Sequence, residues 1–317
     1  MFPKQDCKHR LFDYEIEKEI SIQEMVQKRL AKPLQHSGLG LDDFILERIR
    51  VNDMPVNMTH KLEEKDVLSY LHLETDEAFQ NLKLTVLYED DDIIAIDKPN
   101  AISVTPSIST FFSCIVFVAR RQFKNKKISP IHRLDMDTTG VLLLSKHSEA
   151  AKNFNQLGKD EFKKIYKAMV TGEFPTSIEK ISGSIVRDES SDIYSKFKLV
   201  QDGSEESITN VINVKQNRSF SEVTLHLETG KTNQIRVHLA SLGFPIVGDK
   251  KYFPDESVYL NWYEYGKEDD QMLIPHMALH AASIEFTHPR TGEQVVVESK
   301  DREYNEKRMK IIQSSFK

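Results

Sequence analysis

The sequence feature that most constrains the fold is residues 132–146, which read HRLDMDTTGVLLLSK. The stretch opens with four polar or charged side chains: His132, Arg133, Asp135 and Asp137. A Thr-Thr-Gly turn then leads into the apolar run 141–144, which is typical of a buried strand. A carboxylate so near a core strand needs a cationic partner, because an unpaired buried charge is costly or takes up a proton. Arg133 and a later arginine are the candidates, although the same composition also fits a loop of solvated charges.

Length, charge and cysteine content limit the class of protein. The 317 residues suffice for one large domain or two moderate ones. The 43 basic and 49 acidic residues give a net charge of −6, which excludes a globally basic nucleic-acid binder but not a local basic patch. Two distant cysteines, Cys7 and Cys114, argue against a disulfide scaffold and suit a reducing cytosol. Since there is no membrane-length apolar run and the start is acidic, we expect a soluble, cytoplasmic protein with no membrane partner.

A small first domain is expected over residues 1–75. Apolar residues at helical spacing predict a helix over 21–32 with Ser21 as its N-cap, and a second helix is expected over 41–49. A hairpin should follow, with its turn at Asn52–Asp53. The expected helices and hairpin carry the basic residues Lys28, Arg29, Arg48 and Arg50. A generic helix-hairpin appendage would show the same pattern.

An acidic linker, 76–83, should lead into a second domain, 84–317. Residues 84–99 predict two strands joined at Asp90–Asp92, and we expect this acidic turn to be a solvated tip. Lys98 and Pro99 then lead into an irregular segment, 100–110, which we expect to line a pocket. A helix over 149–158, capped by Ser148, should follow the central stretch. Further strands are expected at 162–174, 183–187, 194–200, 207–214 and 221–228, so the fold class is α+β with a mixed, mostly antiparallel sheet.

Two basic regions are candidates for anion binding. Residues 118–133 contain no acid and six basic residues, which are Arg120, Arg121, Lys124, Lys126, Lys127 and Arg133. Such a concentration suits phosphate contacts, although a solvated helix face would look the same. Farther on, Thr232 should cap a helix running to Leu242, with Gln234 and Arg236 near its start and off its buried stripe. A helix start beside Lys231 is a natural anion site, the alternative being an arginine on a solvated face.

Ordered motifs extend through the second domain. HRLD and DTTGVLLLSK are followed by K-x-Y-x-A-x-V-x-G-E, then GKTNQIRVHL, G-D-K-x-Y, LHA and F-x-H-P-x-T-G-E. In this order and spacing, residues 84–300 resemble RluA-like pseudouridine synthases. The first domain is similar to the small RNA-binding domain that many members carry, which was first known from a small-subunit ribosomal protein. Asp53 stands where the hairpin of that domain usually has glycine.

The resemblance implies specific roles for individual residues. Asp135 matches the catalytic aspartate, and Arg133 the arginine that enters the RNA helix as the uridine is flipped out. Tyr166 matches the tyrosine that stacks on the target base, and Arg236 the arginine that pairs with the aspartate. Besides Arg133, the expected RNA-contacting residues are His132, Lys98, Lys231, Asn233, Gln234, Arg120, Arg121, Lys28, Arg29 and Arg50.

The implied reaction requires an accessible, ionised carboxylate. Isomerising uridine breaks the sugar–nitrogen bond, turns the uracil and rejoins it through carbon, so the base must leave its stack. Asp135 either attacks the anomeric carbon or removes a neighbouring sugar proton, and the sequence leaves both open. A nearby Arg236 would favour the ionised form in either case. We expect a monomer that acts on RNA, either large-subunit ribosomal RNA or transfer RNA, with no metal and no cofactor because the isomerisation has no redox step.

The chain departs from the family's motifs in two places, and two other classes of protein fit part of the sequence. Lys231 and Asn233 replace the arginine and histidine of the common G-R-T-H-Q-I-R motif, and residues 254–275 look like an inserted loop or partner surface. Residues 135–139 also fit the D-x-D-x-T element of haloacid-dehalogenase-like phosphatases, but that element follows an apolar strand, whereas here it precedes one. The other rival is an RNA-binding protein without activity. His276 and His280 lack a third ligand for zinc, and a strand is the better interpretation there.

Overall fold

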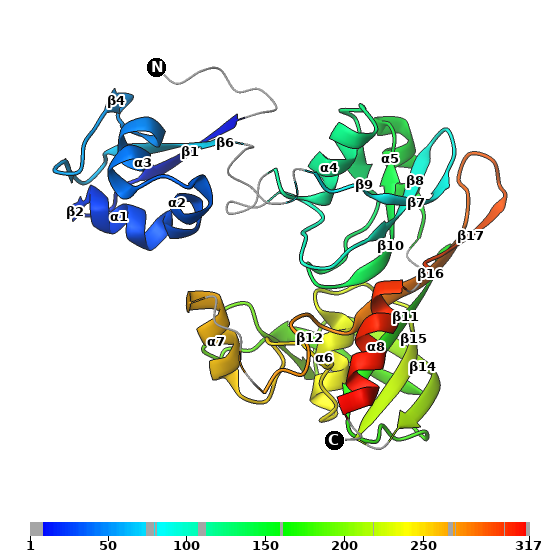
Figure 1. Ribbon diagram of the computed structural model, residues 1–317. Coiled ribbons are helices and arrows are strands. Elements are labelled where there is room, and N and C mark those ends of the chain that lie inside the picture. Colours follow the sequence, from blue (N-terminus) through cyan, green and yellow to red (C-terminus); the bar gives the residue numbers. More distant parts are fainter. Residues whose placement is uncertain are drawn as a thin grey trace. The chain divides into compact units, whose positions relative to one another are not determined.

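The computed structural model describes residues 9–73, 79, 81–106, 112–158, 161–217, 219–265, 269, 271–300 and 302–314. The chain divides into two compact units, which Figure 1 shows in ribbon form. The first unit comprises Met1–Lys83 and Thr105–Gln122, and the second comprises Leu84–Val104 and Phe123–Lys317. The expected boundaries, 1–75 and 84–317, differ from this division at 105–122, which group with the first unit. Half of the expected linker lies outside the described residues, and the RNA-binding role of the first unit stays a prediction.

The first unit is a small sheet packed against helices. Its elements are β1 (His9–Glu15), β2 (Ile20–Ser21), α1 (Ile22–Arg29), α2 (Ala31–Ser37), α3 (Leu41–Arg48), β3 (Ile49–Val51), β4 (Met54–Pro55), β5 (Lys61–Leu62), β6 (Val67–Leu73) and α4 (Ile115–Gln122). The main sheet has the order β1-β6-β3-β4, and β2 pairs with β5. Side chains of α1, α3 and β6 form its core, including the buried Val26, Phe44 and Tyr70.

The expected cap and hairpin turn of the first unit are both present, but the end of the first helix and the strand β1 differ from expectation. Ser21 caps α1, because its hydroxyl accepts a hydrogen bond from the N–H of Glu24 at 3.2 Å. Asn52 and Asp53 form the hairpin turn with φ of 48° and 64°, a left-handed conformation that Asn and Asp tolerate. The first helix ends at Arg29 instead of continuing to residue 32, and α2 follows it. Strand β1, which the sequence analysis missed, pairs along its whole length with β6.

The second unit is built on one large sheet. Its strands are β7 (Thr85–Glu89), β8 (Ile93–Lys98), β9 (Ser129–Pro130), β10 (Thr139–Ser145), β11 (Phe162–Thr171), β12 (Lys180–Arg187), β13 (Phe197–Val200), β14 (Glu206–Asn217), β15 (Phe220–Leu227), β16 (Leu279–Thr287) and β17 (Gln294–Glu298). Its helices are α5 (Ser148–Gln156), α6 (Gln234–Ser241), α7 (Glu256–Tyr265) and α8 (Arg302–Ser314). Among the described residues of both units, no helix is long and apolar enough to span a bilayer.

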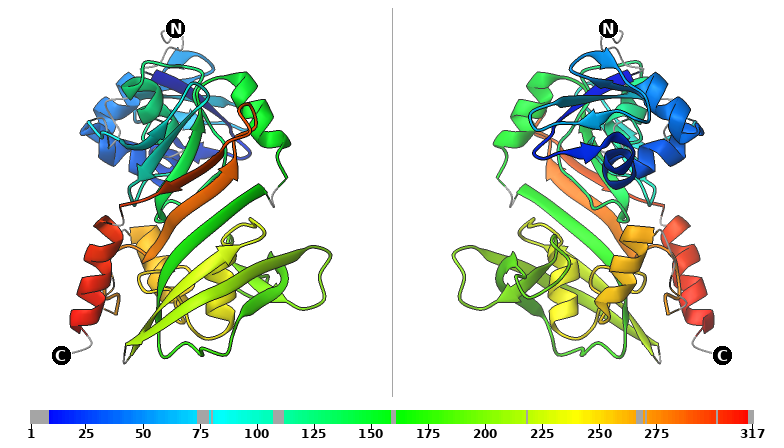
Figure 2. Two further views of the ribbon diagram at one scale, coloured as in Figure 1. Left: turned by 90° about the vertical axis from the view of Figure 1, so that its right-hand side faces the viewer. Right: turned by 90° about the vertical axis from the view of Figure 1, so that its left-hand side faces the viewer.

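The order of this sheet is β13-β12-β14-β15-β11-β16-β10-β8-β7, with β17 beside β16 and β9 beside β10. Figure 2 shows the long strands β11 and β16 side by side in the middle. Every described pairing is antiparallel except that of β10 with β16. The α+β class with a mixed, mostly antiparallel sheet is therefore confirmed.

The parallel contact of β10 with β16 fixes the start of β10, directly after the 132–138 loop. All seven residues of β10 are buried. Gly140 lies opposite Ala281 with φ of 104°, and a Cβ at this position would lie 2.1 Å from the carbonyl oxygen of Ala281. Beside it, the Thr139 hydroxyl and Nδ1 of His280 are hydrogen-bonded at 2.7 Å. The glycine is therefore required by close backbone approach within the strand.

Three local expectations in the second unit are wrong. The N-cap of α5 is His147, whose Nδ1 accepts from the N–H of Ala150 at 3.2 Å, and not Ser148. Helix α6 begins after Asn233, which has a φ of 55°, so Thr232 is not its cap. The segment 254–275 contains the helix α7 and is not simply a loop.

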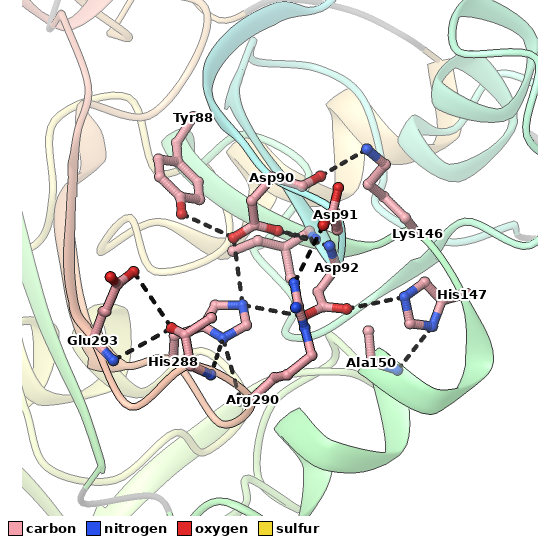
Figure 3. A network of polar contacts seen from close by, with 12 residues as sticks. Tyr88, Asp90, Asp91, Asp92, Lys146, His147, Ala150, His288, Arg290 and Glu293 are labelled. Atoms are coloured by element: carbon pink, nitrogen blue, oxygen red, sulfur yellow. Dashed lines mark hydrogen bonds and ion pairs between the residues drawn. The ribbon is translucent and has the colours of Figure 1, made fainter.

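The acidic turn 90–92 is not a solvated tip. Asp92 is buried, with Arg290 Nε donating to its Oδ2 and His147 Nε2 lying 3.0 Å from its Oδ1 (Figure 3). Although burial opposes ionisation, these two partners hold the pKa of Asp92 below its usual range. The turn therefore joins β7 and β8 to the loop between β16 and β17.

Gly140→Ala is expected to lower the free energy of unfolding by about 3 kcal/mol or more, because it adds both a left-handed backbone penalty and a backbone clash. Urea unfolding followed by circular dichroism measures the change. Gly230→Ala is the matched control, since a Cβ there meets nothing within 4 Å. A Gly140→Ala protein as stable as this control would contradict the packing argument.

Candidate active site

A buried lysine holds the loop that carries Asp135. Lys98 lies at the end of β8, and its Nζ donates to the carbonyl oxygens of Pro99, Met136 and Thr138 at 2.9, 2.7 and 2.9 Å. These bonds use all three ammonium protons. Burial lowers the pKa of Lys98 to about 7, against the opposing effect of Asp137. The expectation that Lys98 contacts RNA is therefore wrong, because this side chain is 1% exposed and its ammonium group is hydrogen-bonded to the backbone of the loop.

Arg236 connects the loop to α6. Its Nη1 donates to Oδ2 of Asp135 at 2.9 Å and to Oδ1 of Asn233 at 3.0 Å. Its Nε and Nη2 bind both oxygens of Asp249, at 2.7 and 2.8 Å, in the bidentate geometry that a guanidinium favours. The guanidinium also lies 5.0 Å from the ring centroid of Tyr252.

These contacts set the charge state of Arg236. Burial opposes the positive charge, but Asp249 and Asp135 outweigh it and hold the pKa of Arg236 well above its usual value. The side chain of Arg236 is 12% exposed, and Arg236 is not among the buried residues of α6, as expected. Gln234, which was also expected to lie off the buried stripe, is buried, so that expectation is wrong. Asp249 was missed by the sequence analysis, although its G-D-K-x-Y motif was recognised.

A pocket of about 350 Å³ opens over this pair. Asp135, Tyr166 and Arg236 all line it, as do Leu279 and the segment 229–231. Tyr166 comes from β11, and its burial, followed by the nearby Asp135, raises the pKa of its hydroxyl, which stays protonated. The side chain of Asp135 remains 33% exposed. The pocket thus combines an accessible carboxylate, an aromatic ring and a fixed cation at one place.

The pocket is locally basic although the chain is acidic. Its lining contains the cationic residues Arg133, Lys164, Lys231 and Arg236 but only one carboxylate, that of Asp135. Sequence analysis missed Lys164. The available signal was its position two residues before Tyr166 on a strand, which places both side chains on the same face.

The family follows from comparison with known proteins. Residues 92–241 match the RNA pseudouridylate synthase family. The RNA pseudouridine synthase YhcT of Bacillus subtilis is 30% identical over 264 residues, which cover 80% of this chain and 81% of YhcT. Ribosomal large subunit pseudouridine synthase D of Pseudomonas aeruginosa is 31% identical over 231 residues, covering 69% of each chain. The chain belongs to the RluA-like family of RNA pseudouridine synthases.

Solved structures agree on the fold of this synthase. Human RNA pseudouridylate synthase domain containing 1 superposes with a TM-score of 0.56 at 24% identity, covering 71% of this chain and 86% of that one. The enzyme class implied by the motifs is thereby confirmed through the family, and the phosphatase alternative is wrong. In agreement with this, the strand β10 follows the Asp135–Thr139 element and does not precede it.

Two residues expected to contact RNA, Gln234 and Asn233, form hydrogen bonds within the protein. Gln234 uses its whole amide within the protein. Its Oε1 accepts from the Thr229 hydroxyl and the Lys231 N–H, and its Nε2 donates to Ile208 O and Thr209 Oγ1. No bonding capacity remains for RNA, so that expectation is wrong.

Asn233 binds the guanidinium of Arg236 and donates from Nδ2 to the Tyr252 hydroxyl at 3.2 Å. The residue is 9% exposed. The amide that replaces the histidine of the common motif therefore holds the Arg236 guanidinium in position. Contact of Asn233 with RNA stays a prediction.

His132 and Arg133 differ in exposure. Nε2 of His132 accepts from the N–H of Leu143 at 3.2 Å, which joins the loop to β10. Burial, followed by nearby Lys164, lowers the pKa of His132 to about 3, so its ring is neutral. Arg133 is exposed at the pocket rim, and Lys231 forms an ion pair with Glu205. RNA contact by these residues stays a prediction.

The remaining expected contacts lie in the first unit and do not line this pocket. Lys28 pairs with Glu24, Arg50 Nη1 donates to Leu46 O and Ile49 O, and Arg121 donates to Phe79 O. Arg29 and Arg121 are exposed and Arg120 is half-buried. Among the described residues of 100–110, none lines the pocket, so the expectation for that segment is wrong as far as it is described.

One group among the described residues has metal-ligand spacing, formed by Asp90, Asp92 and His288. Nδ1 of His288 accepts the N–H groups of Arg290 and Thr291 at 3.2 and 3.3 Å, so the ring proton belongs on Nε2, which faces the carboxylates. A protonated Nε2 cannot ligate a metal. With Arg290 also on Asp92, the geometry favours a structural ion network.

Acidification should destabilise the folded synthase through His132. The unfolded ring gains a proton near its ordinary pKa of 6.5, whereas the folded ring gains one only near 3. Between these values the unfolded state binds more protons, so stability is complete above 6.5 and is lost as the pH falls. The variant His132→Gln keeps an acceptor for the N–H of Leu143. It should reduce the slope of the free energy of unfolding against pH by about 1.4 kcal/mol per pH unit, as measured by urea titrations at several pH values. Equal slopes for the two proteins would contradict this assignment.

Asp249→Asn is expected to lower kcat about 100-fold, because Arg236 loses its charged clamp and Asp135 its fixed partner. Turnover is measured by pseudouridine formation, below the unfolding temperature of the variant. Asp202→Asn, on the exposed loop between β13 and β14, is the control and should retain wild-type kcat. A normal kcat in Asp249→Asn would show that the clamp is dispensable.

Proposed function

We propose that this synthase isomerises specific uridines in large-subunit ribosomal RNA. Two kinds of observation support this target over transfer RNA. Relatives named ribosomal large subunit pseudouridine synthase C and D cover most of the chain, with 28% identity over 297 residues for the Buchnera aphidicola enzyme C. The first unit also resembles a domain first known from a ribosomal protein, and it offers the exposed cations Lys28 and Arg29.

The ion pair of Asp135 with Arg236 at 2.9 Å is the observation that carries the proposed mechanism. A uridine everted into the pocket brings its anomeric carbon and neighbouring sugar proton to Asp135. Tyr166 supplies a flat apolar surface for the uracil, and exposed Arg133 enters the vacated place in the RNA. Extrusion costs a few kcal/mol, which base stacking and the inserted cation offset.

The carboxylate acts in one of two ways. It attacks the anomeric carbon and releases uracil, or it removes a neighbouring sugar proton as the same bond breaks. The uracil then turns, and its carbon bonds to the anomeric carbon. This bond displaces the Asp135 carboxylate in the first route, and in the second the neighbouring sugar carbon takes back its proton from Asp135. The proton on the bonding uracil carbon is then lost, and the freed ring nitrogen gains one. Arg236 holds the Asp135 carboxylate in place through their ion pair while the base is detached. Both routes use only this chain and the RNA, in keeping with a cytoplasmic monomer that needs no cofactor.

Asp135→Asn should abolish pseudouridine formation, because the amide cannot serve as nucleophile or base. RNA affinity should stay within about threefold of wild type, since the shape is kept and only one charge is lost. Asp202→Asn is the matched control, which makes the same carboxylate-to-amide change at an exposed position that does not line the pocket and should retain turnover. Substantial turnover by Asp135→Asn would remove this residue from the mechanism.

Mapping pseudouridines in total RNA with and without the gene tests the target. Loss of one or more sites in large-subunit ribosomal RNA is the expected result. Loss confined to transfer RNA would overturn the ribosomal target and leave the enzyme class intact.

A further inference from the structure

A second, smaller pocket adjoins the active site. It has a volume of about 140 Å³, less than half that of the pocket lined by Asp135, Tyr166 and Arg236. Asp135 and Arg236 line both pockets, so their ion pair is the wall between them. The remaining lining residues are Met136, Asp137, Asp249, Lys250, Lys251, Tyr259, Trp262 and Met277.

One wall of this second pocket is aromatic and comes from α7. Tyr259 and Trp262 are in contact, with ring centroids 5.8 Å apart. Tyr263, which is 60% exposed, stacks on Tyr259 at 5.9 Å and 15° and extends the aromatic surface outward. Aromatic surfaces of this kind bind nucleic-acid bases with little dependence on sequence.

Two lysines lie against these rings. Lys250 Nζ is 5.3 Å from the Trp262 ring centroid and donates to the carbonyl oxygen of Pro275. Lys251 Nζ is 5.5 Å from the Tyr259 ring centroid and 2.9 Å from the Ser195 hydroxyl. Burial, followed by the nearby Arg236, lowers the pKa of Lys251. A phosphate placed beside its Nζ would favour the charged form of this side chain.

The aromatic wall is held in place by the first residue of α7. Glu256 accepts from Ser191 Oγ and Lys196 Nζ at 2.7 Å each, and from the N–H of Asp192 at 3.2 Å. These contacts tie α7 to the loop between β12 and β13, beside which it lies in Figure 1. Although burial opposes ionisation, Lys196 and Ser191 hold the pKa of Glu256 below its usual range, so the anchor is charged.

We propose that this second pocket binds the base of the nucleotide next to the target uridine, with Lys251 contacting its phosphate. The proposal rests on the proposed RNA substrate and adds the position of a neighbouring nucleotide. The pocket suits a single base, whose sugar and phosphate then lie at the rim. A strand that delivers uridine to one side of the Asp135–Arg236 pair brings its next base to the other side. Met136, whose carbonyl is fixed by Lys98, lines the same pocket as the aromatic residues.

The test uses the full-length enzyme and the RNA in which the modified uridine has been mapped. Trp262→Ala should raise KM about 10-fold with little change in kcat, in line with the stacking energy of one base. The KM of the wild-type enzyme should be higher by a similar factor for an RNA that lacks the base on the 5′ or 3′ side of the target than for the intact RNA. With that abasic RNA, Trp262→Ala should cause no further increase.

Two additional variants separate binding from folding. Lys251→Met should reduce the slope of log Kd against log salt by about 0.7, the loss of one single-strand phosphate contact. Tyr194→Ala removes a 78% exposed tyrosine that does not line the pocket, and it should match wild type throughout. A KM effect of Trp262→Ala that persists on both abasic RNAs would overturn the proposal, as a merely structural role predicts.

An unchanged KM for Trp262→Ala on intact RNA would likewise overturn the proposal. Absence of any pseudouridine formation by the wild-type enzyme would instead refute the proposed function. The two failures are therefore distinguishable.

Discussion

The active site depends on one guanidinium held between two carboxylates. Arg236 carries its charge in a nearly buried position, which is tolerable only because Asp249 binds it bidentately and Asp135 completes its shell. The three residues come from α6, from the loop after it and from the loop before β10, so the pair forms only when these elements meet. The contacts among Asp135, Arg236 and Asp249 therefore form only as this part of the chain folds.

The arrangement of the strands explains how the loop that carries Asp135 and the ring of Tyr166 are placed. The close, parallel approach of β10 to β16 at Gly140 sets the end of the catalytic loop, and Lys98 fixes its backbone through three carbonyl groups. On the other side of β16, β11 presents Tyr166. Because β16 pairs with both strands, the carboxylate and the stacking ring are positioned by one rigid piece of sheet.

Sequence reasoning succeeded where a residue type is tied to the chemistry and failed where polar groups are satisfied within the fold. Asp135, Tyr166 and Arg236 were found through ordered motifs, and the pocket brings them together. Gln234 and Lys98 looked like RNA contacts because their types suit phosphate and base, but their donors and acceptors are used internally, which only the fold reveals. The turn at Asp92 was misread for a similar reason, since its partner Arg290 is distant in sequence.

Net charge is a poor guide to RNA recognition in this chain. A protein of net charge −6 still surrounds its catalytic carboxylate with four cationic side chains, two of which, Lys164 and Arg236, have fixed positions on β11 and α6. The chain-wide excess of acid weakens long-range attraction to phosphate, since exposed charges are screened over about 8 Å at physiological salt. Contacts within the pocket act over shorter distances than that. The positions of the cations around Asp135 are therefore a better guide to where a phosphate would bind than the total charge of the chain.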